Sequence, residues 1–422
     1  MNPQSRARSA GLSLIEILIA LAIGSLLILA LVQVFGASRT AYQLSTGLAR
    51  TQENGRFAID ILQRDIRMAG HMGCVNDQSR FLPANVTASR PALISSFLTP
   101  DEQFGTGASP TSDYAAAPDA LRFDLGIEGF NAVGTSSGNA LALAAVPSLA
   151  ADASAWEPAL PATLYSDLVG DGTGPGVPVA GSDVIALRFF APTGAQVTSF
   201  TPGANTVIQV DTMTQLMEGD ANPGLFGIAD CMQAGVFNAS AVAGSNITVA
   251  TGGLNESTFD TTPQFTVGQA MLYRAQSFVY YVGLNDFDNP ALYRLRYRAD
   301  PGGAIEVERE EMVEGVESLQ LQFGQDSNTT TTGRPTGNIG ASVVANALLP
   351  AGAANYDHAW RRVGMVQVGV VARSPDAAAA SQREAGTMRL SALGVIMTPP
   401  EDTRYRAVYE DSIALRNRLF GN

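Results

Sequence analysis

The sequence contains no lysine, because all 26 of its basic residues are arginine. This absence excludes a P-loop lysine, a Schiff-base amine and a lysine that acts as a general base. Histidine is almost as scarce, with only His71 and His358, and no Gly-x-Ser-x-Gly motif occurs. We therefore predict that the protein is not an enzyme and that it binds no cofactor.

Ligands for metal ions are few as well. The two histidines and the two cysteines, Cys74 and Cys231, do not form a set at the spacing of a zinc site. Asp286 and Asp288 lie in the run Leu-Asn-Asp-Phe-Asp-Asn, which could bind calcium but is more typical of a polar hairpin turn. The sequence thus predicts no metal site.

Acidic residues outnumber basic ones, and the formal net charge is −13. Such a surface repels polyanions at long range, so we expect no direct binding to nucleic acid. One local exception is the run Leu292–Arg298, in which Arg294, Arg296 and Arg298 share one face of a predicted strand. We interpret this face as solvated or as a patch for a protein partner.

The most informative feature that is present is a long apolar run near the N-terminus. From Ile17 to Ala37 roughly 21 residues pass without a charge, which corresponds to about 32 Å of helix and spans a bilayer. Glu16 is the only charged residue between Gly11 and Phe35, and a carboxylate at the edge of a membrane span costs about 1–3 kcal/mol. One explanation is that Glu16 reaches the lipid headgroups. Alternatively, the segment could be a secretory signal peptide that is cleaved near Gly36, although its apolar core is longer than that of an ordinary signal peptide.

The residues around Glu16 resemble the class III signal of type IV prepilins and pseudopilins. Arg6 and Arg8 precede Gly11 in a short polar leader, and Glu16 is the fifth residue after Gly11. The resemblance implies that prepilin peptidase cuts between Gly11 and Leu12 and methylates the new amine of Leu12. It also implies that Glu16 pairs with the N-terminal amine of an adjacent subunit and sets the register between helices. Leu12 departs from the Phe that the family usually has there.

We predict that the helix continues beyond the membrane, because no proline interrupts residues 4–82. Ala58, Leu62 and Ile66 repeat at helical spacing, and charged residues occupy the opposite face. Gly70 is expected to end the helix. A helix over residues 12–69 would be about 87 Å long, and its second half would lie against a globular head. A membrane anchor followed by a separate short helix is the alternative.

The remaining residues, 71–422, are enough for a large head with its own core. Five runs alternate in polarity or are apolar throughout, as strands do; they are Asp183–Phe190, Ser277–Tyr281, Leu292–Arg298, Val316–Phe323 and Val363–Ala372. Residues 90–181 are rich in Ala, Gly, Ser and Pro, which predicts a loop-rich insert or a second lobe with short strands. Exposed loops are expected at residues 329–340 and 375–386. The predicted fold class is α+β, with a long N-terminal helix packed on a large, mostly antiparallel β-rich head.

An even pair of cysteines in an exported head favours a disulfide between Cys74 and Cys231, because that side of the membrane is oxidising. The bridge would close a loop of about 157 residues, for which the chain-entropy model gives about 5 kcal/mol. Two free, buried thiols are the alternative.

Several short sequence motifs in the head resemble those of minor pilins of the PilW family. They are Ala-Gly-His-Met-Gly-Cys ending at Cys74, Asp-Cys-Met-Gln-Ala-Gly-Val-Phe around Cys231, Leu-Tyr-Arg at Leu292, Val-Glu-Gly-Val-Glu-Ser-Leu-Gln-Leu-Gln-Phe-Gly from Val313 and Ala-Leu-Arg-Asn-Arg near the C-terminus. The resemblance implies a minor pilin that helps initiate the type IV pilus in a tip or priming complex. Twitching motility, adhesion and DNA uptake would depend on it indirectly. The implied partners are other minor pilins, the major pilin, prepilin peptidase and a tip adhesin.

The resemblance also implies where each part of the chain resides. Residues 1–11 form the leader that is removed, and residues 12–37 lie in inner-membrane lipid before assembly and in the filament core afterwards. Residues 38–70 form the amphipathic half of the helix. Residues 71–422 form a head that lies in the periplasm and later on the pilus at the cell surface.

Two other functions fit part of the pattern. A pseudopilin of type II secretion carries the same signal, but its head is usually much shorter. A membrane-anchored periplasmic enzyme or binding protein would carry a similar anchor, and the scarcity of His, Cys and Lys argues against an enzyme.

Overall fold

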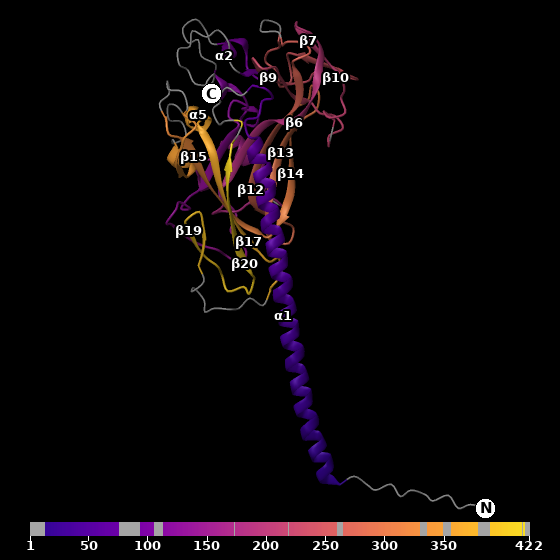
Figure 1. Ribbon diagram of the computed structural model, residues 1–422, viewed down its shortest axis with the longest axis vertical. Coiled ribbons are helices and arrows are strands. Elements are labelled where there is room, and N and C mark those ends of the chain that lie inside the picture. The colour runs from indigo at the N-terminus through magenta and orange to yellow at the C-terminus, as the bar shows by residue number, and fades with distance from the viewer. Residues whose placement is uncertain are drawn as a thin grey trace, which may run out of the picture.

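The computed structural model describes residues 13–75, 93–104, 113–172, 174–217, 219–259, 265–329, 336–348, 356–378, 389–415 and 417. Helix α1 (Leu14–Met68) is a rod of 55 residues, and the rest forms a head around its C-terminal part (Figure 1). This arrangement confirms the predicted α+β class. Gly11 and Leu12 lie outside the described residues, so leader cleavage and methylation there stay predictions.

Helix α1 is continuous, so the alternative of an anchor and a separate short helix is wrong. Its N-terminal half is exposed, and within the described ranges it is the one helix long and apolar enough to cross a membrane. The helix ends at Met68, and Gly70 follows with a φ of 71°, a left-handed conformation that favours glycine. The predicted end of the helix is confirmed.

In the part of the head that the structure describes there are three sheets, and most of their strand pairs are antiparallel, as predicted. The largest has 13 strands, which are β1 (Leu93–Ser95), β2 (Ile127–Ala132), β4 (Trp156–Glu157), β5 (Val177–Pro178), β6 (Val184–Thr201), β7 (Asn205–Val210), β8 (Leu225–Ala229), β9 (Ala234–Asn238), β10 (Ala241–Ala243), β11 (Asn246–Ala250), β12 (Met271–Leu284), β13 (Pro290–Ala299) and β14 (Ile305–Glu314). A four-stranded sheet follows the order β16 (Ile339–Val343), β15 (Val316–Asp326), β17 (Val363–Arg373) and β20 (Arg406–Ala414). A three-stranded sheet joins β18 (Leu390–Ala392), β19 (Val395–Thr398) and β3 (Ala140–Ala142).

The remaining helices are short. They are α2 (Pro100–Phe104), α3 (Ala162–Val169), α4 (Ala345–Leu348) and α5 (Tyr356–Arg361), with single 3-10 turns at η2 (Tyr114–Ala116), η3 (Asp119–Leu121) and η4 (Ala153–Ala155). Apart from α1, the head is therefore held together mainly by its strands.

Each of the five predicted strand runs overlaps an observed strand, and these are β6, β12, β13, β15 and β17; only Asp183 falls outside, directly before β6. Strand β17 is central, because it pairs with β15 on one side and with β20 on the other. The second half of α1 lies against β17 and β20 (Figure 1). Its predicted apolar stripe, Ala58, Leu62 and Ile66, is fully buried in a core shared with β6, β12, β15 and β17.

The described parts of residues 90–181 contain the short strands β1 to β5 as well as α3. Phe130, Trp156 and Leu164 from this segment share one core with Val279 and Tyr293 of the main sheet. The segment is thus part of the main body of the head rather than a second lobe. The predicted loops at 329–340 and 375–386 lie partly outside the described residues.

Candidate assembly site

Glu16 lies in the first turn of α1 and is exposed. Its carboxylate accepts a hydrogen bond of 2.9 Å from the backbone N–H of Ser13, as the acidic residue of a capping box does. A negative charge at a helix N-terminus is also favoured by the helix dipole. In the single chain Glu16 therefore caps its own helix, and its carboxylate stays accessible to a second subunit.

Small residues line the helix face next to Glu16. Ala20, Gly24 and Ser25 lie between Glu16 and Ile28 on this face, and a Cβ atom on Gly24 would meet nothing within 4 Å. The Ser25 hydroxyl is satisfied within the helix, because it donates to the Ala22 carbonyl at 2.8 Å. Small side chains let helices approach one another closely in a membrane. The exposed half of α1 thus presents an apolar face with one carboxylate.

The second half of α1 touches the head through glycines that the sequence analysis did not single out. A Cβ atom on Gly55 would overlap the ring of Tyr409 in β20, and one on Gly47 would overlap the Ala378 side chain. The Tyr409 hydroxyl donates to the Thr51 carbonyl at 3.4 Å. Gly47, Thr51 and Gly55 therefore continue the buried stripe of α1 toward its N-terminus and let the backbone approach the head.

Asp65 is a buried carboxylate on the same stripe. The Tyr280 hydroxyl donates to it at 2.5 Å, and Arg294 Nη1 lies 3.7 Å from the same oxygen. Arg294 also pairs with Glu310 at 2.5 Å and covers the Phe278 ring at 4.7 Å. Burial, and then the Asp65 charge, raise the pKa of Tyr280 far above its usual range, so the phenol stays a neutral donor.

The sequence indicates that Asp65 lies on the buried face of the helix. It follows Leu62 by three residues and Ala58 by seven, which is the spacing of one helix face. A carboxylate on an apolar stripe requires a partner. That requirement predicts a buried ion pair or hydrogen bond, although it does not identify Tyr280.

The arginines of β13 are not a free patch, so the prediction of a solvated or partner-binding face is wrong. Arg298 and Arg296 lie 3.0 Å and 3.6 Å from the buried carboxylate of Asp220, and Arg274 lies 3.0 Å from it. Glu308 on β14 lies beside Arg296 and Arg298. These charges are paired within the head, because strands adjacent to β13 and the segment before β8 bring acids to them.

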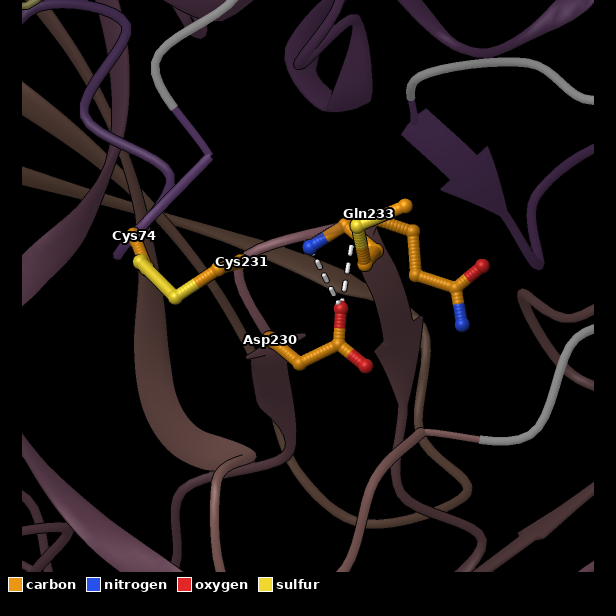
Figure 2. Close-up of a disulfide and its surroundings, with 5 residues drawn as sticks. Cys74, Asp230, Cys231 and Gln233 are labelled. Carbon is orange, nitrogen blue, oxygen red and sulfur yellow. Dashed lines mark hydrogen bonds between the residues drawn. A yellow bond between two sulfur atoms is a disulfide. The ribbon is translucent and has the colours of Figure 1, made fainter.

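Cys74 and Cys231 form a disulfide, with their Cα atoms 4.8 Å apart (Figure 2). Cys74 follows α1, and Cys231 lies in the turn between β8 and β9. Asp230 holds this turn, because its carboxylate accepts from the backbone N–H groups of Met232 and Gln233 at 2.8 Å and 3.0 Å. The bridge attaches the C-terminal end of α1 covalently to the main sheet.

The run around Asp286 and Asp288 is a hairpin turn between β12 and β13, as predicted. The Asn285 side-chain oxygen accepts from the backbone N–H groups of Phe287 and Asn289, each at 3.0 Å. Asp288 has a φ of 57°, which an aspartate tolerates in a tight turn. In the part of the chain that the structure describes, no group of three or more His, Cys, Asp or Glu could hold a metal ion.

The two histidines lie in different surroundings. His71 Nδ1 is 2.8 Å from the Phe190 carbonyl oxygen, just beyond the end of α1. His358 lies on α5, where burial and then the charges of Arg361 and Arg362 lower its pKa below the usual value. The histidines therefore do not meet in one site.

Two family models match the chain. The type IV pilus-assembly protein W family, PilW, matches residues 279–417, and the prokaryotic N-terminal methylation motif matches residues 6–32. No curated protein and no solved structure matches it. The PilW match begins within β12 and includes the four-stranded sheet, whereas the methylation motif includes Glu16 and much of the apolar run. This N-terminus fits anchoring in the inner membrane with the head in the periplasm, and the two matches support a type IV pilin-like protein related to PilW.

Proposed function

We propose that this protein is a minor pilin that helps to initiate the type IV pilus as part of a tip or priming complex. The observation that carries the proposal is the union of a prepilin N-terminus on an exposed apolar helix with a large head fixed to its other end. The role is binding rather than catalysis. Other minor pilins, the major pilin and a tip adhesin are the proposed partners.

In this proposal prepilin peptidase removes residues 1–11, and Leu12 supplies the methylated amine. Cleavage creates a positive charge one helical turn before Glu16. An unpaired carboxylate in an apolar bundle is costly, and pairing it with the amine of a neighbouring subunit offsets that cost. Neighbouring helices would therefore pack in the register that places this amine beside Glu16. They would do so only after cleavage has created the amine.

The size of the head supports a place at the tip. Beyond α1 the described residues of the head form three sheets and several buried cores. A subunit within a filament has neighbours above and below, whereas a subunit at the tip has neighbours on one side only. A bulky head is therefore tolerated at the tip.

The test replaces Glu16 by Ala in the chromosomal gene and counts surface pili. We expect pili to fall to the level of the gene deletion, while the chain is still made and its leader removed. The matched control is Ser25→Ala on the same helix face, because that hydroxyl bonds only its own helix. Loss of secreted folded enzymes with intact pili would instead indicate a type II secretion pseudopilin. No change in either would indicate an anchored periplasmic protein of another kind.

The mass of the mature N-terminus tests the processing step separately. A chain that begins at Leu12 with one added methyl group is the expected product. A chain that begins at Met1, or beyond Ala37, would contradict the proposal.

A further inference from the structure

Two segments at one end of the head carry exposed apolar side chains. Phe287, at the tip of the β12–β13 turn, is 81% exposed. Val146 and Leu149, which are 57% and 45% exposed, belong to the uncharged run Ala142–Leu149. We call Phe287, Val146 and Leu149 the base patch.

A single buried arginine joins the two segments. Arg373 Nη1 donates to the Ala145 carbonyl at 2.8 Å, and its Nη2 donates to the Asn289 side-chain oxygen at 3.2 Å. Its guanidinium is paired with Glu317 at 3.3 Å and is 1% exposed. The Phe287 turn is also held by Asn285, as described above. The base patch is therefore preformed, which lowers the entropy cost of binding.

The position of the base patch along α1 follows from contacts at the end of β14. The Asn54 side chain of α1 donates to the Glu314 carbonyl at 2.8 Å, and the next residue, Gly315, donates to Pro290 at the start of β13. Strand β14 runs toward the end of the head from which α1 leaves (Figure 1). The Phe287 turn therefore lies near the height of Asn54.

At this height the base patch lies too far from the membrane to contact lipid. From Ala37, where the apolar run ends, to Asn54 the helix rises about 26 Å. The headgroup region on one side of a bilayer is only about 5–8 Å thick. An upright subunit would hold the base patch well above the membrane, at a height where it meets protein or solvent and not lipid.

We propose that the base patch docks on the amphipathic half of a neighbouring pilin-type helix that carries basic side chains. The inference rests on the proposed function, because a helix packed beside α1 in register brings its own second half to this height. Asp286 and Asp288 are exposed on both sides of Phe287 and attract cations to the aromatic ring. The outward face of α1 itself has this chemistry, with exposed Arg56 and Phe57.

The experiment places the photo-crosslinking residue p-benzoylphenylalanine at position 287 of the full chain in cells that assemble pili. The control places it at Val267, which is 49% exposed and lies next to Thr266, a residue bonded to Asp230 at the disulfide end of the head. We expect position 287 to give an adduct with a protein that begins with a prepilin motif. The yield should exceed that at Val267 about tenfold. Adding D286R and D288R should lower it by a similar factor.

Three outcomes would overturn the inference. They are a lipid adduct alone, equal yields at positions 287 and 267, and a yield that charge reversal leaves unchanged. The Glu16→Ala experiment separates this inference from the proposed function. If Glu16→Ala abolishes pili and position 287 gives no specific adduct, the minor-pilin role stands and the base patch fails. If Glu16→Ala leaves pili intact, the proposed function itself fails.

Discussion

The hydroxyl of Tyr280 donates a hydrogen bond of 2.5 Å to the carboxylate of Asp65, which joins α1 to β12 inside the core. Arg64 of the same helix also donates to Asp65 at 3.0 Å, whereas the hydrogen bond from Tyr280 forms only when α1 turns Asp65 toward β12. The apolar stripe alone would tolerate small rotations. The Asp65–Tyr280 bond therefore favours one rotation of α1 about its axis, and hence one outward face for its exposed half.

Replacing Tyr280 by Phe should destabilise the head by about 1–3 kcal/mol, because it leaves the buried Asp65 without its closest donor. The free energy of unfolding can be measured by urea denaturation of the detergent-solubilised chain, with the fluorescence of Trp156 and Trp360 as the signal, since both are buried. Tyr42→Phe is the control, because Tyr42 is 74% exposed on α1. Equal midpoints for the two variants would contradict the assigned role of this bond.

The parts of the fold that the sequence predicts are those with a local period. The apolar run, the helical spacing of Ala58, Leu62 and Ile66, and the alternation in β13 and β15 each depend on neighbours within one element. Glu16 and the cysteine pair could also be singled out, because each is an isolated chemical type in its surroundings. These features required no knowledge of tertiary contacts.

The parts that the sequence does not predict depend on residues far apart in the chain. In the sequence Gly55 is only a residue of low helix propensity, and its contact with the Tyr409 ring cannot be predicted. The arginines of β13 look free until Asp220 is placed beneath them. A single sequence specifies these pairs only through the complete fold, because more than 70 residues separate each pair.

Gly55→Ala should lower the free energy of unfolding by about 1–3 kcal/mol, because the added methyl group overlaps the Tyr409 ring and overpacks the contact. The matched control is Gly36→Ala in the same helix, where a Cβ atom meets nothing within 4 Å. Urea denaturation measures both. If Gly55→Ala were as stable as Gly36→Ala, the close approach of α1 to β20 would be contradicted.

Replacing Cys74 and Cys231 by Ser should cost up to about 5 kcal/mol, because the bridge closes a long loop that is otherwise free in the unfolded chain. A reducing agent should destabilise the native chain by the same amount and leave the double variant unchanged. Denaturation with and without the reductant makes the comparison. If the reducing agent also destabilised the double variant, the loss of stability would not come from the disulfide.

Asp183 joins the two larger sheets and should make their stability depend on pH. Its carboxylate accepts from the backbone N–H of Ala132 in β2 and of Leu321 in β15, each at 2.7 Å. Burial raises its pKa from 3.8 to about 7, and the hydrogen bonds from Ala132 and Leu321 offset only part of that rise. Asp183 is fully buried, so solvent does not screen this effect.

Between these two pKa values the folded state holds a proton on Asp183 that the unfolded state has lost, so stability falls as pH rises. The contribution is complete below the unfolded pKa of 3.8 and is lost as pH rises through about 7. Asp183→Asn removes this dependence. We expect the difference in unfolding free energy between native chain and variant to be larger at pH 5 than at pH 7 by about 2 kcal/mol. Urea denaturation at both pH values measures it, and equal differences at pH 5 and pH 7 would mean that Asp183 is ionised in the folded state at both.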